Sequence, residues 1–79
     1  MLVRFYAVGR EIAGVDELRL GATDITELAA ALEAAFGARM GLLAAAATLL
    51  HNGTRYRTSD VYTFADDDVV DLLPPFAGG

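Results

Sequence analysis

The chain starts with an apolar run that one charge, Arg4, interrupts, and residues 2–8 fit a strand. An extended segment 2–8 would place Val3, Phe5 and Ala7 on one face and Leu2, Arg4, Tyr6 and Val8 on the other. Gly9 and Gly14 then bracket a turn region, and residues 16–20 fit a second short strand. The pattern predicts an N-terminal β-hairpin.

The hydrophobic period changes from two to about 3.6 in the next segment. The apolar positions at helical spacing are Ile25, Leu28, Leu32 and Phe36. Asp24 is suited to cap the first turn, with Glu27 three residues later, and Gly37 is a natural stop. The sequence therefore predicts an amphipathic helix over residues 25–36.

Strand patterns return in the second half of the chain. The alanine-rich residues 38–47 are ambiguous and leave room for a second helical turn. Segments 48–51 and 54–57 flank Asn52-Gly53, the pair favoured in type I′ hairpin turns because both positions need positive φ. After the polar corner 66–68, residues 69–73 form a last apolar strand that the following prolines end.

The order of these elements, β-β-α-β-β-β, predicts an α+β fold. We expect a mixed sheet of four or five strands with one main helix across one face, which leaves the other face free for docking. Residues 1–73 would form the domain, and residues 74–79 would form an extended, flexible tail that ends in Gly-Gly.

Composition excludes several kinds of site. The 79 residues include no cysteine, which removes disulfides, thiolate metal sites and a cysteine nucleophile. The net charge of −5 makes a nucleic-acid partner a poor match and favours a partner with a basic surface. The longest apolar stretch, residues 41–50, is too short for a bilayer, and residues 1–11 are too polar for a signal peptide, so a cytoplasmic protein is expected.

The C-terminal residues 74–79 are the candidate reactive segment that remains after these exclusions. Pro74 and Pro75 hold the chain stiff, and six extended residues reach about 20 Å, far enough to enter the active site of another protein. Gly78 and Gly79 lack Cβ atoms and can thread a narrow channel. A terminal carboxylate on Gly79 is a competent nucleophile toward an activated phosphate; the alternative is a passive, frayed end.

Other candidate residues divide into two groups. His51 is the single histidine and is expected to be a surface side chain, and the acidic run 66–68 is expected to be a solvated turn and not a metal site. The aromatic residues Tyr6 and Phe76, with Leu73 beside the tail, favour an interface with another protein.

The two ends of the sequence resemble the MoaD/ThiS family of ubiquitin-like sulfur carriers, most of all the small subunit of molybdopterin synthase. The similarity rests on the C-terminal Leu-Leu-Pro-Pro-Phe-Ala-Gly-Gly, on residues 5–14 and on the Asn52-Gly53 turn. Departures are the acidic corner, where the family usually has a central glycine, and the charged residues Arg4 and Asp71, where relatives often carry apolar ones.

The resemblance implies a β-grasp fold and a carrier that is not itself catalytic. An E1-like (MoeB-like) enzyme would use ATP to adenylate Gly79, and a sulfur donor would convert the adenylate into a thiocarboxylate. A MoaE-like large subunit, in a heterotetramer of two small and two large subunits, would take the tail and use the sulfur for the dithiolene of molybdopterin. The partner-binding residues implied are Tyr6, Leu73, Pro75, Phe76, Ala77 and Gly78, and no cofactor or metal is bound.

Other functions stay open from the sequence. The same chemistry serves carriers for cysteine synthesis, tRNA thiolation or thiamine synthesis. A ubiquitin-like modifier would instead be joined through Gly79 to a lysine of another protein, and a passive β-grasp binding module would not use its glycines at all.

Overall fold

The computed structural model describes residues 1–56 and 63–75, and within them it contains a mixed sheet of five strands. The strands are β1 (Leu2–Phe5), β2 (Glu17–Arg19), β3 (Thr48–His51), β4 (Thr54–Arg55) and β5 (Val69–Leu73), in the order β2-β1-β5-β3-β4. β1 runs parallel to β5, and the β1–β2, β3–β5 and β3–β4 pairs are antiparallel. The predicted mixed sheet and α+β class are confirmed.

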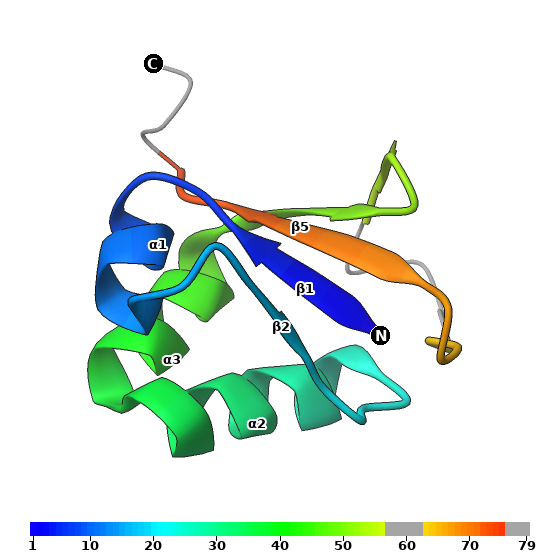
Figure 1. Ribbon diagram of the computed structural model, residues 1–79, viewed down its shortest axis with the longest axis horizontal. Coiled ribbons are helices and arrows are strands. Elements are labelled where there is room, and N and C mark those ends of the chain that lie inside the picture. Colours follow the sequence, from blue (N-terminus) through cyan, green and yellow to red (C-terminus); the bar gives the residue numbers. More distant parts are fainter. Residues whose placement is uncertain (57–62, 76–79) are drawn as a thin grey trace.

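Three helices lie together on one side of the sheet (Figure 1). They are α1 (Val8–Ala13), α2 (Ile25–Phe36) and α3 (Ala38–Ala46). The predicted bounds of α2 are confirmed, and so is its cap: the carboxylate of Asp24 accepts a hydrogen bond from the Glu27 N–H at 2.8 Å. The Glu27 carboxylate reaches back to the N–H and hydroxyl of Thr23, both at 2.9 Å, so the first turn is closed from both sides.

The prediction of a strand through Val8 followed by a turn is wrong. The strand ends at Phe5, because Ala7 takes a left-handed φ of 51° with ψ −127° and redirects the chain into α1. Ala7, expected to share a face with Val3 and Phe5, is exposed, whereas those two residues are buried. Gly9 allows α1 to pack closely on α3, since a Cβ at this position would lie 3.2 Å from the Leu43 side chain.

The alanine-rich segment, where the sequence left room for a helical turn, forms a full helix. The helical layer therefore contains more than the one main helix that was expected. α3 follows α2 directly after Gly37, whose φ is 95°. Alanine favours helix by propensity alone, and Met40 and Leu43 supply the buried side of α3. α2 remains the longest of the described helices, as expected.

The predicted hairpin and last strand are confirmed. Asn52 and Gly53 have φ values of 51° and 85°, the positive pair that a type I′ turn requires. The returning strand is described as Thr54–Arg55, and the expected end of that strand at residue 57 lies outside the described residues. β5 has the predicted bounds, Val69–Leu73.

The core lies between the sheet and the helices. Side chains of the inner sheet face meet those of α2 and α3, and the most deeply buried are Val3, Val70, Leu72, Leu28, Leu32 and Met40. Among the described residues, no helix is long and apolar enough to cross a membrane.

Candidate docking face and tail exit

The candidate tail leaves the domain from the middle of the sheet. β5 lies between β1 and β3, and its last residue, Leu73, is half-buried. Pro74 is buried and Pro75 is exposed, so the chain emerges between the two prolines. The predicted site residues Phe76, Ala77, Gly78 and Gly79 lie outside the described part of the chain.

The second face of the sheet carries none of the described helices, and we call it the open face (Figure 1). The strand register assigns its side chains, because partners across strands share a face and neighbours along a strand alternate. Its apolar residues, all half-buried, are Leu2, Leu50, Val69 and Leu73. Its charged residues are Arg4, Glu17, Arg19, Arg55 and Asp71.

A carboxylate sits at the centre of the open face. Asp71 is only 7% exposed and is the one buried charged residue in the described ranges 1–56 and 63–75. Arg4, its partner across the β1–β5 ladder, donates from Nε to Oδ1 at 2.5 Å and from Nη2 to Oδ2 at 3.0 Å. The Tyr6 hydroxyl donates to Oδ1 at 3.0 Å, so all three side chains form one network.

These contacts shift the ionisation of all three groups. The hydrogen bonds from Arg4 hold the pKa of Asp71 below its ordinary value, against the opposing effect of burial. Burial raises the pKa of Tyr6, and its hydrogen bond to Asp71 raises it further. Arg4 has a raised pKa through the same contact with Asp71. At neutral pH the network therefore consists of a carboxylate, a guanidinium and a neutral phenol.

The network also brings Tyr6 to the root of the tail. Phe5 pairs with Leu72, so Tyr6 and Leu73 follow at the same end of β1 and β5. The bond from Tyr6 to Asp71 places its phenol over the open face, and the residue is 37% exposed. The structure thus brings together Tyr6 and Leu73, two of the residues predicted to bind a partner; that role stays a prediction.

His51 is not the surface side chain that the sequence predicted. Its side chain is 13% exposed, and its Nε2 lies 2.8 Å from Oδ2 of Asp68. The ring also meets Phe64 edge-on, with the centroids 5.1 Å apart. The lone histidine therefore has a carboxylate partner that lies 17 residues away in the sequence.

Asp68 is likewise more than part of a solvated turn. Its carboxylate accepts hydrogen bonds from the Ala65 N–H at 2.7 Å and from the Asn52 amide at 3.0 Å. These bonds and the contact with His51 hold the pKa of Asp68 well below its usual range. Because the Asn52 side chain in turn accepts from the Val69 N–H, the cluster ties the hairpin to the start of β5. In the described residues, no group of three or more His, Cys, Asp or Glu side chains could hold a metal.

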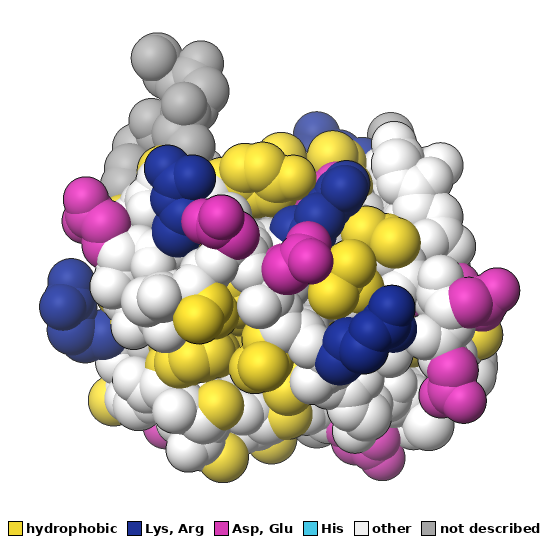
Figure 2. Space-filling view, in the orientation of Figure 1, with side chains coloured by type: hydrophobic (Ala, Val, Ile, Leu, Met, Phe, Trp, Pro, Cys, Tyr) yellow, Lys and Arg dark blue, Asp and Glu magenta, His cyan; other side chains and the backbone are white. Residues whose placement is uncertain are grey.

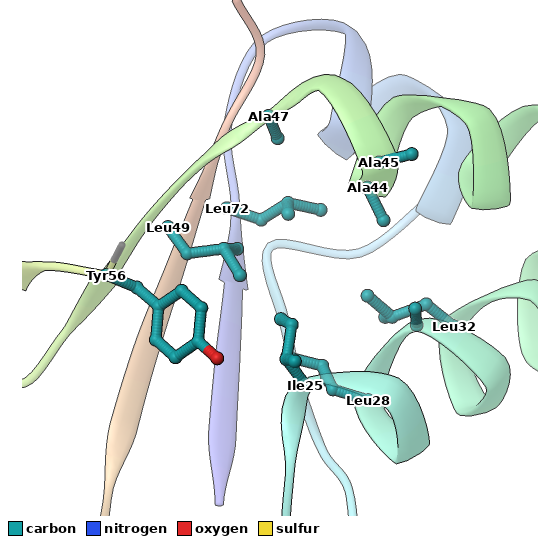
Figure 3. Close-up of a pocket in the computed structure, with 10 residues that line it drawn as sticks. Ile25, Leu28, Leu32, Ala44, Ala45, Ala47, Leu49, Tyr56 and Leu72 are labelled. Carbon is teal, nitrogen blue, oxygen red and sulfur yellow. The ribbon is translucent and has the colours of Figure 1, made fainter. Parts of the chain in front are cut away.

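A small cavity of about 180 Å³ lies between the sheet and the helices (Figure 3). Its lining is apolar apart from the Tyr56 phenol, and includes Ile25, Leu28, Leu32, Ala44, Leu49 and Leu72. Such a lining offers no acid–base pair and no activated nucleophile. The cavity has no part in the chemistry expected of the tail.

Comparison with solved structures identifies the class of fold. Small archaeal modifier protein 1 from Methanosarcina acetivorans superposes with a TM-score of 0.81 at 24% identity, over 99% of this chain and 94% of that one. The protein of the same name from Haloferax volcanii superposes with a TM-score of 0.73 at 21% identity, over 99% of this chain and 97% of that one. No protein-family model and no curated protein sequence matches the chain. The chain has the ubiquitin-like β-grasp fold.

One further neighbour belongs to a two-component assembly. A chain in the complex of subunits 1 and 2 of molybdopterin-converting factor from Helicobacter pylori matches with a TM-score of 0.68 at 27% identity. The match covers 99% of this chain and 96% of that one. The shared fold extends over nearly the whole of both chains.

Proposed function

We propose that this protein is a sulfur carrier that supplies the sulfur of the molybdopterin dithiolene from a thiocarboxylate on Gly79. The observation that supports this most is the position of the first tail residues, Pro74 and Pro75, which follow the central strand β5 beside an open face with a partly exposed tyrosine. The full-length likeness to a chain of the Helicobacter pylori factor agrees with it. The carrier supplies the reacting carboxylate, and partner enzymes supply the catalysis.

Two steps account for the transfer of sulfur to the tail. A carboxylate oxygen of Gly79 attacks the α-phosphorus of ATP on an E1-like, MoeB-like enzyme, and pyrophosphate leaves. Sulfide then attacks the acyl carbon, the bond between that carbon and the phosphate oxygen breaks, and AMP leaves with the oxygen. The product is a C-terminal thiocarboxylate, which a MoaE-like large subunit receives in a complex of two small and two large subunits.

Proline stiffness and bare backbone suit the tail to this role. Pro74 is buried and fixes the starting direction of the tail, and Pro75 limits its bending. Gly78 and Gly79 present no side chain to a narrow channel. No ATP is held by the carrier itself, since the nucleotide belongs to the activating enzyme.

A second function is favoured by the likeness to the archaeal modifier proteins. Here the same adenylate would be attacked by a lysine amine of a target protein, with loss of AMP, to form an isopeptide bond. The carrier and modifier functions share the activation of Gly79 and differ in the nucleophile that follows.

Intact-mass spectrometry tests the proposal. We expect incubation with the E1-like enzyme of the same organism, ATP and sulfide to raise the mass by the difference between one sulfur and one oxygen atom. Deletion of Gly79 should abolish the change, and Gly78→Val should impair it because a branched Cβ enters the channel. Gly21→Val is the matched control, because a Cβ at Gly21 meets no atom within 4 Å.

The outcomes separate the two functions. Conversion to the thiocarboxylate, followed by molybdopterin formation with the large subunit, supports the carrier. Covalent adducts on lysines of other proteins, without molybdopterin formation, favour the modifier. A chain without Gly79 that supported molybdopterin formation at the normal rate would overturn the proposal.

A further inference from the structure

The open face differs in charge from the rest of this acidic protein. It carries three arginines, Arg4, Arg19 and Arg55, against the two acids Glu17 and Asp71. The other described residues hold two arginines and eight acids, and the whole chain has a net charge of −5. Positive charge is thus concentrated on the one sheet face that carries none of the described helices.

The two outer arginines of the open face lie on either side of its apolar side chains. Arg19 lies on the edge strand β2 and Arg55 on the opposite edge strand β4. Four strand spacings of about 4.8 Å put these two strands about 19 Å apart. Between them lie Leu2, Val69 and Leu50, which are half-buried and are not among the side chains that pack on the core. Figure 2 shows hydrophobic side chains beside arginines at the upper border of the molecule.

The two outer arginines keep their charge available. Asp71 neutralises Arg4 at the centre of the face, but neither Arg19 nor Arg55 forms an ion pair with residues 1–56 or 63–75. Both are exposed. The open face thus combines apolar side chains and an internally neutralised ion pair with free charges at its edges, and a polar, charged rim is typical of a protein–protein interface.

We propose that the open face docks on the tail-activating enzyme, through an enzyme surface that offers apolar side chains to Leu2, Leu50 and Val69 and carboxylates to Arg19 and Arg55, which lie on strands about 19 Å apart. This inference rests on the proposed function, because the tail starts from β5 on this same sheet and an enzyme that encloses the tail must approach the face. The net charge alone suggests a basic partner, whereas the charge on the open face requires an acidic one. The acidic remainder of the carrier would repel such an enzyme in other orientations and steer the face toward it.

Two pairs of charge reversals, each of which lowers the net charge of the chain by the same four units, test the inference. The first double variant, Arg19→Glu with Arg55→Glu, reverses the two outer charges of the open face. The control double variant, Arg10→Glu with Arg39→Glu, reverses the charges of two exposed arginines on the helical side. With the E1-like enzyme, ATP and sulfide, we expect the first pair to lower kcat/KM for the carrier by about tenfold or more at low salt. Its kcat at saturating carrier should stay unchanged, and the defect should shrink as salt screens the charges. The control pair should change kcat/KM by less than about twofold.

The possible outcomes separate this inference from the proposed function. Equal losses for the two pairs, or a gain for the open-face pair, would overturn the acidic docking surface while thiocarboxylate formation still supported the carrier. If the wild-type chain gained no sulfur, the carrier function would fail, and calorimetric binding to the same enzyme would still test the face. Circular dichroism confirms that each variant is folded before its kinetics are compared.

Discussion

Arg4 and Asp71 face each other across the parallel pairing of β1 and β5, and the guanidinium donates two hydrogen bonds to the carboxylate. Each residue alone interrupts the apolar pattern of its strand. Together, with the Tyr6 hydroxyl as a third partner, they form a cross-strand pair that joins the first strand to the strand that leads into the tail. The charge at the centre of the open face is therefore neutralised within the protein.

Replacing Asp71 by asparagine should destabilise the fold modestly. The charged acceptor of Arg4 and Tyr6 is lost from a side chain that is 10% exposed, while Arg4 can turn toward water because its own side chain is 44% exposed. We expect the free energy of unfolding to fall by about 1 kcal/mol in urea titrations followed by circular dichroism. Asp67→Asn, in the exposed corner, is the control and should stay within about 0.5 kcal/mol of wild type. Identical midpoints for all three proteins would contradict this role of the network.

Acid should destabilise the protein through Asp71 and Asp68. Both have pKa values below the ordinary 3.8. The main cause is the hydrogen bond from Arg4 in the case of Asp71, and the hydrogen bond from the Ala65 N–H in the case of Asp68. A group with a depressed folded pKa stabilises the fold above its unfolded pKa, and that stability is lost as the pH falls through the folded value. The free energy of unfolding should therefore decline below about pH 4, and less steeply in Asp71→Asn. A free energy that stayed constant or rose on acidification would refute the assignment.

Tyr6 should ionise later than an ordinary tyrosine. Burial and the bond to Asp71 raise its pKa above the usual 10.0, so the stability that it contributes is present below that pH and is lost as the pH rises further. Absorbance of tyrosinate during an alkaline titration measures this directly. The variant Tyr6→Phe keeps the ring and lacks the hydroxyl, so its titration curve should lack one tyrosine that ionises late in the wild type. If the tyrosine missing from the curve of the variant is one that ionises early, the hydrogen bond from Tyr6 to Asp71 does not hold in solution.

If the proposed function holds, Tyr6→Asp should weaken binding to the MoaE-like large subunit without unfolding the chain. Tyr6 lies at the root of the tail and is 37% exposed, and loss of an interface anchor typically costs about 2 kcal/mol or more. Calorimetry gives the affinity and circular dichroism checks the fold. Leu42→Asp is the matched control, because Leu42 is a large apolar residue that is 75% exposed on α3. Equal affinities for wild type and Tyr6→Asp would remove Tyr6 from the interface. Phe76→Asp should weaken binding in the same way.

Local signals predicted part of the fold well. The bounds of α2 follow from its apolar period and from the Asp24–Glu27 cap, and the hairpin follows from Asn52-Gly53, because each signal acts within a few residues. α1 was missed because Ala7 adopts a positive φ, which the identity of alanine does not indicate. The sequence leaves α3 ambiguous because runs of alanine favour a helix without marking its buried side.

The contacts that sequence reasoning missed are long-range. His51 meets Asp68 across 17 positions, and Arg4 meets Asp71 across 67. Both pairs depend on the register of strands around β5, which periodicity along one strand does not fix. Signals were nevertheless present in the sequence: a charge inside each of two otherwise apolar strands, and a histidine and an asparagine at the hairpin.

The central position of β5 means that only a finished domain displays the open face and the root of the tail together. β5 needs β1, whose Leu2 pairs with Val69, and it needs β3 on its other side. The pairing of β1 with β5 brings together residues from the two ends of the chain, and closing so long a loop is entropically costly. The assembled core therefore secures the pairings of β5, which the sequence of β5 alone could not do. A partner that binds the open face and the tail together therefore also selects folded copies of the protein. An unfolded copy would offer such a partner the tail without the surface that it needs for binding.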